Sequence, residues 1–158
     1  MRRSDREIKN IAEIIEIIEK CDVCRLALAD NNIPYVVPIC YGYEYTDDRL
    51  TLYFHAAKEG RKLEMIAKNP LACFEMDCSH KLIKAEEAQN YSMEYESVIG
   101  FGKIHMCTEK PEMIKALTLL MKKYDKDRQF DFPDHVIESA AIFKLVVSEF
   151  TGKRLKKS

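Results

Sequence analysis

The chain has 158 residues, of which 32% are charged and 47% hydrophobic, and its formal net charge is -1 at pH 7. This length suits a single domain with its own core, and the balanced charge argues against disorder and against a nucleic-acid partner. No apolar run approaches the ~20 residues that cross a bilayer, and no apolar signal core follows the charged start, so we expect a cytoplasmic protein without membrane contact.

The first predicted element is an amphipathic helix over residues 5–20. Ser4 and Glu7 have capping-box spacing, and isoleucines then recur at helical period. The following runs are rich in strand-forming residues and are separated by Asp and Asn turn sequences. They predict a three-stranded antiparallel meander made of Cys24 to Ala29, Tyr35 to Tyr45 and Arg49 to Ala57.

The second half of the chain predicts two more helices among further strands. The expected elements are a helix over residues 60–69, strands Leu71 to Cys78 and Ser97 to Cys107, a helix from Thr108, and a strand Ala141 to Phe150 before the basic tail Lys153 to Lys157. The polar segment Lys81 to Glu94 is expected to be a loop or an edge excursion. Few helices among long β runs favour a mainly β protein with peripheral helices (α+β), an antiparallel barrel in one domain over residues 1–158.

The segment Leu52 to Leu63 carries the strongest functional signal. Strand alternation places Phe54 and Ala56 on one face, and His55 and Ala57 on the other. Lys58, Gly60, Arg61 and Lys62 then surround a helix start, where free backbone N–H groups and the helix dipole favour an anion. A phosphate would suit this turn, and a solvated basic turn is the alternative.

A proline interrupts the strand around Val37, Pro38 and Ile39. Because proline cannot donate to the ladder, this position should lie at an edge, at a bulge or beside a ligand. A flat aromatic ligand along Val37 to Ile39 would explain it, and so would an edge proline that blocks aggregation. Gly100 and Gly102 share one strand face and would admit a backbone, a bulge or a cofactor.

Cysteine and histidine patterns indicate no metal site. Cys21 and Cys24 form one CxxC, but no second ligand pair or βαβ context accompanies it. The six cysteines lie mostly in apolar runs and are expected to be reduced. His105 alternates with Lys103 and is expected to face solvent.

These motifs together resemble the FMN-binding flavoproteins related to pyridoxamine 5'-phosphate oxidase, most closely the nitroimidazole-resistance (Nim) branch. The similarity is carried in order by Pro34 to Ile39, Leu52 to Ala57, Glu59 to Lys62, Asn69-Pro70, Ser97 to Gly102 and Thr151 to Arg154. The resemblance implies a six-stranded antiparallel split β-barrel and an obligate homodimer with FMN at the interface. It also implies that Val37, Pro38 and Ile39 lie beside the flavin ring.

The resemblance further implies that Phe54, His55, Ala56 and Ala57 line the site, and that Lys58, Gly60, Arg61 and Lys62 hold the FMN phosphate. The equivalent of His55 is linked to activity in the Nim branch, which makes His55 the candidate catalytic residue. The chain has no tryptophan, unlike the true pyridoxamine oxidases, which argues against vitamin B6 oxidation.

The predicted function is an FMN-dependent, nitroreductase-like oxidoreductase that passes two electrons from reduced flavin to a small-molecule acceptor. A flavin-binding or flavin-sensing protein without turnover is the alternative from another class. Haem binding also stays open, since some relatives bind haem or a deazaflavin and His55 would lie near the cofactor.

Overall fold

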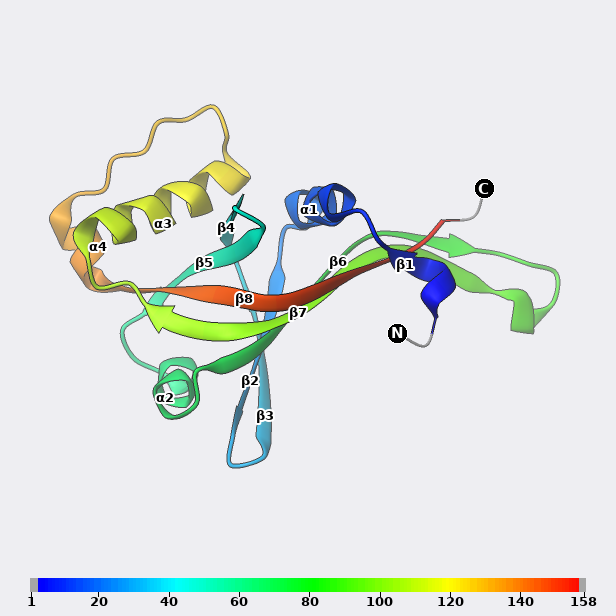
Figure 1. The fold of residues 1–158 in the computed structure, drawn as a ribbon, viewed down its shortest axis with the longest axis horizontal. Helices are drawn as coiled ribbons and strands as arrows, with labels where there is room; N and C mark the ends of the chain where they lie inside the picture. Colours follow the sequence, from blue (N-terminus) through cyan, green and yellow to red (C-terminus); the bar gives the residue numbers. More distant parts are fainter. Residues whose placement is uncertain (1–2, 157–158) are drawn as a thin grey trace.

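The computed structural model describes residues 3–156, so Met1, Arg2, Lys157 and Ser158 lie outside it. An eight-stranded antiparallel sheet has the order β3-β2-β6-β7-β8-β5-β4, and β1 pairs with β8 off this path (Figure 1). The strands are β1 (Glu7–Ile8), β2 (Cys24–Asp30), β3 (Ile33–Ile39), β4 (Gly42–Thr46), β5 (Arg49–Ala57), β6 (Leu71–Ile83), β7 (Ser92–Met106) and β8 (Ala140–Leu155). The helices are α1 (Ile11–Lys20), α2 (Arg61–Lys68), α3 (Lys110–Tyr124) and α4 (Asp134–Ser139).

The mainly β, α+β class predicted from the sequence is confirmed. The sheet has eight strands rather than six and is not closed, so the predicted strand number is wrong. The long strands β6, β7 and β8 form its centre, while the hairpins β2–β3 and β4–β5 occupy its two ends. Among residues 3–156, no helix is long and apolar enough to span a membrane.

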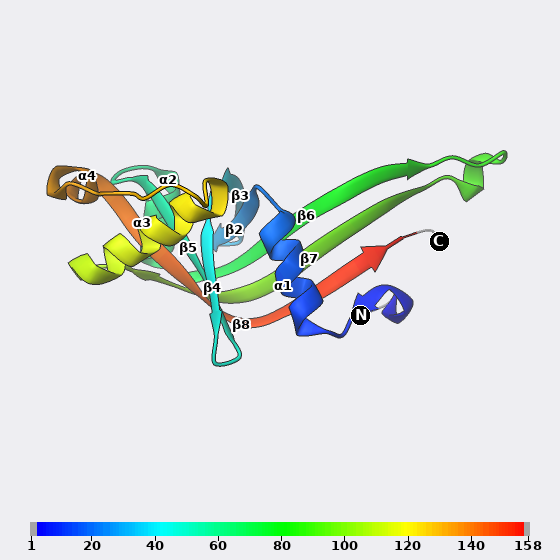
Figure 2. The same ribbon diagram turned by 90° about the horizontal axis from the view of Figure 1, so that it is seen from above.

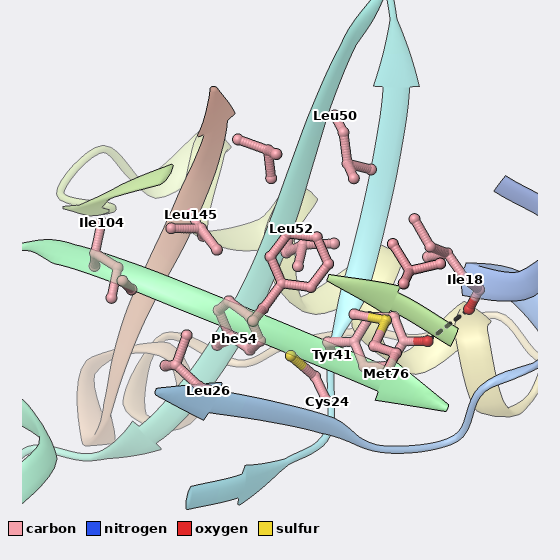
Figure 3. Packing of buried hydrophobic residues seen from close by; sticks show 14 of the residues in the cluster. Ile18, Cys24, Leu26, Tyr41, Leu50, Leu52, Phe54, Met76, Ile104 and Leu145 are labelled. Atoms are coloured by element: carbon pink, nitrogen blue, oxygen red, sulfur yellow. Dashed lines mark hydrogen bonds between the residues drawn. The ribbon is translucent and has the colours of Figure 1, made fainter. Parts of the chain in front are cut away.

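The core lies on the inner face of the curled sheet (Figure 3). Phe54 and Phe143 stack there with ring centroids 5.3 Å apart, and both side chains are fully buried. The Tyr41 hydroxyl donates to the carbonyl oxygen of Ile18 at 2.5 Å, which ties the strand side of the core to α1. A fully buried hydroxyl needs such an acceptor.

The N-terminal helix begins later than predicted. It starts at Ile11, and the side chain of Asn10 accepts a hydrogen bond from the Ala12 amide at 3.0 Å. The residues of the expected capping box instead form a 3-10 turn at Ser4–Arg6 and strand β1, which pairs with Lys153 and Gly152 of β8. Long-range strand pairing therefore overrides the local helix signal.

The predicted three-stranded meander is also wrong. The run Tyr35 to Tyr45 breaks at Cys40 and Tyr41 into β3 and β4, which lie at opposite ends of the sheet. Tyr41 turns into the core at this break. Gly42 then brings β4 against α3, since a Cβ built on Gly42 would lie 2.4 Å from the Leu120 backbone nitrogen.

Several of the predicted strands are too short. The polar segment Lys81 to Glu94 is not simply a loop, because β6 continues to Ile83 and β7 begins at Ser92. The two strands form an arm that projects from the body of the molecule (Figure 2). A bulge interrupts the arm between Cys78 and Lys81. Strand β8 runs to Leu155, so most of the expected basic tail is strand. Helix α4 was not predicted.

Candidate functional site

The turn between β5 and α2 has the geometry of an anion site. Gly60 precedes the first helical residue with φ 123° and ψ 164°, and no side chain caps the helix. The Gly60 carbonyl accepts hydrogen bonds from Leu63 at 3.0 Å and Glu64 at 3.2 Å. The Arg61 and Lys62 amides have no such partner within residues 3–156, and a Cβ at Gly60 would meet nothing within 4 Å. The helix start therefore presents free donors to open space.

Three cations surround this turn, and none of them forms an ion pair with a described carboxylate. Lys58 and Arg61 are exposed, and Lys62 is half-buried. Burial lowers the pKa of Lys62, and no neighbouring charge opposes that effect. An anion bound at this turn would favour the charged form of Lys62 and so oppose the effect of burial on its pKa.

Helix α2 fixes the turn beside the β2–β3 hairpin. The Arg61 guanidinium carbon lies 4.9 Å from the centre of the Tyr35 ring on β3. At the other end of α2, Lys68 pairs with Asp30 at 2.8 Å and the Asn69 side-chain amide donates to Ala29 O at 3.0 Å. The basic turn and β3 are thus neighbours, although β3 and β5 are far apart in the sheet order.

The residues Val37, Pro38 and Ile39 lie on β3, which is an edge strand. Of the three positions that the proline left open, an edge, a bulge or a place beside a ligand, the structure shows an edge. Val37 and Ile39 are half-buried and pack against the core, whereas Pro38 is exposed and lies opposite Arg25 on β2. On its free side β3 pairs with no other described strand, so a ring lying along this edge would meet unpaired backbone groups.

Strand β5 separates its predicted site residues onto two faces. Phe54 is fully buried and Ala56 is half-buried on the core side, so the Phe54 side chain itself is out of a ligand's reach. His55 and Ala57 are exposed on the opposite face, as the alternation predicts. His55 lies opposite Ile142 of β8, and no described residue hydrogen bonds to its imidazole. His55 is therefore available to a ligand.

A groove of about 730 Å³ lies on the outer face of the sheet. Its walls combine apolar residues such as Leu71 and Phe101 with Lys103 and His105 of β7. Its size falls within the range of small-molecule pockets. Asn69, which follows α2, also lines it, so the groove meets α2 at the end opposite the basic turn.

The sequence interpretation missed Tyr35 and this groove. Phe101, Lys103 and His105 occupy every second position of β7 and therefore share one face of the strand. This spacing is the sequence signal that could have indicated a common outer surface. His105 is exposed, as predicted.

The two strand glycines have a structural explanation. A Cβ at Gly100 would lie 2.4 Å from the Phe74 ring, and one at Gly102 would lie 2.3 Å from the Val146 carbonyl oxygen. Of the possibilities left open, close approach by the protein itself accounts for both positions, and a bulge in the β7–β8 pairing also lies between Phe101 and Gly102. No cofactor is needed to explain either glycine.

No group of three or more potential metal ligands occurs within residues 3–156. Cys21 and Cys24 are both buried free thiols. Both cysteines of the CxxC are therefore accounted for as core residues.

A family model described as pyridoxamine 5'-phosphate oxidase matches residues 10–154. A comparison with curated proteins found no match.

A crystal structure from Bacteroides thetaiotaomicron, described as a candidate 5-nitroimidazole antibiotic resistance protein, shares 35% identity and a TM-score of 0.82, covering 94% of this chain and 86% of that one. The flavocytochrome Anf3 of Azotobacter vinelandii has a TM-score of 0.81 at 16% identity, covering 99% of this chain and 72% of that one. An FAD- and haem-binding protein of Mycobacterium smegmatis has a TM-score of 0.83 at 15% identity, covering 96% and 74%. The last two show a shared fold alone. The chain belongs to the pyridoxamine 5'-phosphate oxidase family.

Proposed function

We propose that this protein binds FMN, with its phosphate held at the turn Lys58 to Lys62. The observation that carries the proposal is a half-buried Lys62 with no counter-charge beside an uncapped helix start. Arg61 adds a planar donor, and the open space at Gly60 leaves room for phosphate oxygens. Proteins of the same fold that are described as FAD-binding support a flavin at this site.

We further propose that the working unit is a homodimer with the flavin at its interface. The outer sheet face exposes large apolar side chains, including Val36 at 57%, Leu71 at 62% and Phe101 at 49% of their surface. A monomer rarely leaves such a broad apolar face in water. A second copy on this face would enclose a ring lying along β3, a position that one chain leaves open.

The proposed activity is that of a flavin-dependent oxidoreductase of the nitroreductase type. Bound reduced flavin would supply two electrons for a small acceptor such as a nitro compound. The protein would anchor the phosphate, place the ring along Val37 to Ile39 and exclude water. The exposed His55 imidazole would orient the acceptor or donate a proton to it. The description of the Bacteroides relative supports this choice of acceptor.

Flavin binding is tested by absorption of the purified protein and by fluorescence titration with FMN. Arg61→Ala with Lys62→Ala removes two charge-assisted contacts, so the Kd for FMN should rise ~100-fold. The matched control is Arg49→Ala with Lys84→Ala, which removes equal charge from exposed sites that form no ion pair with a described residue. Equal affinity in both double variants would contradict the phosphate site.

Turnover is tested separately, with NAD(P)H as donor and a nitro compound as acceptor. Donor oxidation that depends on both bound FMN and the nitro compound supports the oxidoreductase. Flavin binding without turnover would favour a binding or sensing role. A Soret band in place of flavin absorption would identify a haem protein instead.

A further inference from the structure

The Arg61 guanidinium is held by an aromatic ring and not by a carboxylate. Its central carbon lies 4.9 Å from the centre of the Tyr35 ring, which is close enough for a cation–π interaction. Among residues 3–156, Arg61 forms no ion pair, and no hydrogen bond engages its N–H groups. Because the ring contacts the guanidinium without accepting its hydrogen bonds, these donors remain free for a ligand.

Arg154 shows the contrasting use of an arginine in this fold. Its Nε donates to the Glu96 carboxylate at 2.6 Å, and its Nη1 donates to the Glu13 carboxylate at 2.6 Å. Two carboxylates thus engage the Arg154 guanidinium within the chain. Arg61 instead keeps the planar set of donors that a phosphate group binds well.

Rigid elements fix the position of Tyr35. The residue lies opposite Leu28 in the β2–β3 hairpin, and its half-buried side chain packs against the core. The turn end of the same hairpin is tied to the last turn of α2, where Lys68 pairs with Asp30 at 2.8 Å. The hairpin therefore contacts α2 at both ends of the helix, and the ring is presented to Arg61 by a strand and not by a loop.

The Tyr35 side chain also lies between the two parts of the proposed flavin site. Tyr35, Val37 and Ile39 occupy alternate positions of β3, so their side chains share one face of the strand. Arg61 lies at the Tyr35 end of this face, and the flavin ring is proposed at the end formed by Val37 and Ile39. A ligand with a phosphate at one end and a planar ring at the other matches this order.

We propose that Tyr35 is a positioning residue that holds Arg61 toward the flavin phosphate and makes the site prefer FMN to riboflavin, which has no phosphate. This inference rests on the proposed FMN site. The ring restricts a long, flexible side chain before the ligand arrives, so less conformational entropy is lost on binding. The Tyr35 hydroxyl forms no hydrogen bond with a described residue, so the aromatic ring is the part that acts.

The experiment measures the Kd of the flavin-free protein for FMN and for riboflavin by fluorescence titration. Tyr35→Leu should raise the Kd for FMN ~3–10-fold and leave the Kd for riboflavin within ~2-fold of the wild-type value. Tyr35→Phe keeps the ring and should keep both affinities. The matched control is Phe130→Leu, because the Phe130 ring makes a similar contact with Arg128, 5.5 Å from the ring centre, in the segment between α3 and α4.

A double variant shows whether Tyr35 acts through Arg61. Tyr35→Leu with Arg61→Ala should bind FMN no more weakly than Arg61→Ala alone, because the ring then has no guanidinium to hold. Losses that add in the double variant would overturn the proposal. So would an equal loss of FMN and riboflavin affinity in Tyr35→Leu, which is what a merely structural role would cause. Tyr35→Val is a second variant without the ring, judged by the same criteria if Tyr35→Leu folds poorly.

The wild-type titrations separate this inference from the proposed function. A wild-type protein that binds neither flavin, or binds both equally tightly, would refute the phosphate site and this inference with it. A wild-type protein that prefers FMN, with a preference that Tyr35→Leu retains in full, would refute only the role of Tyr35.

Discussion

Glu96→Gln is expected to destabilise the protein through its buried ion cluster. The Glu96 side chain is only 2% exposed, and it accepts from Arg154 Nε at 2.6 Å as well as from Lys20 and Ser79. Glutamine keeps the shape and still accepts hydrogen bonds but removes the charge. Hydrogen bonds to a charged group contribute ~1.5–3 kcal/mol each. Because Lys20 is half-exposed, hydration of its ammonium group offsets part of the loss. The net loss should be ~2–3 kcal/mol, a fall in Tm of roughly 5–10 °C.

The pH dependence of this effect has a definite sign. Burial acts to raise the pKa of Glu96, but hydrogen bonds from Ser79, Arg154 and Lys20 outweigh it and lower the pKa from 4.5 to about 2. The folded state thus favours the carboxylate. Its stabilising contribution is present above pH 4.5 and is lost as pH falls toward 2. Glutamine cannot titrate, so the stability gap between wild type and variant should narrow in acid.

Urea unfolding at pH 7 and pH 3 measures both effects. The gap in unfolding free energy should fall by at least about half between the two pH values. Glu86→Gln is the matched control, because Glu86 is exposed on the arm and forms no ion pair with a described residue. A variant within ~0.5 kcal/mol of wild type at pH 7, or a gap that does not narrow at pH 3, would refute the reasoning.

Three further substitutions follow from packing and exposure. Gly42→Ala should cost ~2–3 kcal/mol in urea unfolding, because the new Cβ meets the backbone at Leu120, and an unchanged midpoint would contradict that contact. Phe54→Ala should cost ~3–5 kcal/mol by the same assay, and a cost below ~1 kcal/mol would exclude a core role. His55→Ala should lower nitro-compound turnover at least ~10-fold while FMN stays bound, whereas His80→Ala should not; equal turnover in both variants would remove His55 from the proposed activity.

Much of the candidate site could be predicted from local sequence. Strand alternation correctly separated His55 from Phe54, because side chains on a strand alternate strictly between two faces. The proline at position 38 limited its strand position to an edge, a bulge or a ligand site, and the structure shows an edge, where the missing N–H is tolerated. The basic turn is visible in the sequence because Lys58, Arg61 and Lys62 lie within five consecutive residues.

Other features depend on partners that are distant in sequence. The capping-box prediction failed because Glu7 and Ile8 gain a strand partner in β8, and the meander failed because Tyr41 enters the core between β3 and β4. No local pattern near Arg61 indicates its contact with Tyr35. These outcomes are set by non-local pairing, which local propensity does not encode.

The amino-acid sequence by itself determined the mainly β class, the faces of β5 and the basic helix start, because each depends on residues within one or two turns or strand repeats. Tertiary structure alone decided the eight-stranded order and the groove on the outer face. It also decided that Lys62 is half-buried without a counter-charge. Burial and charge pairing are properties of the packed chain, since they arise only when distant segments exclude water from one another.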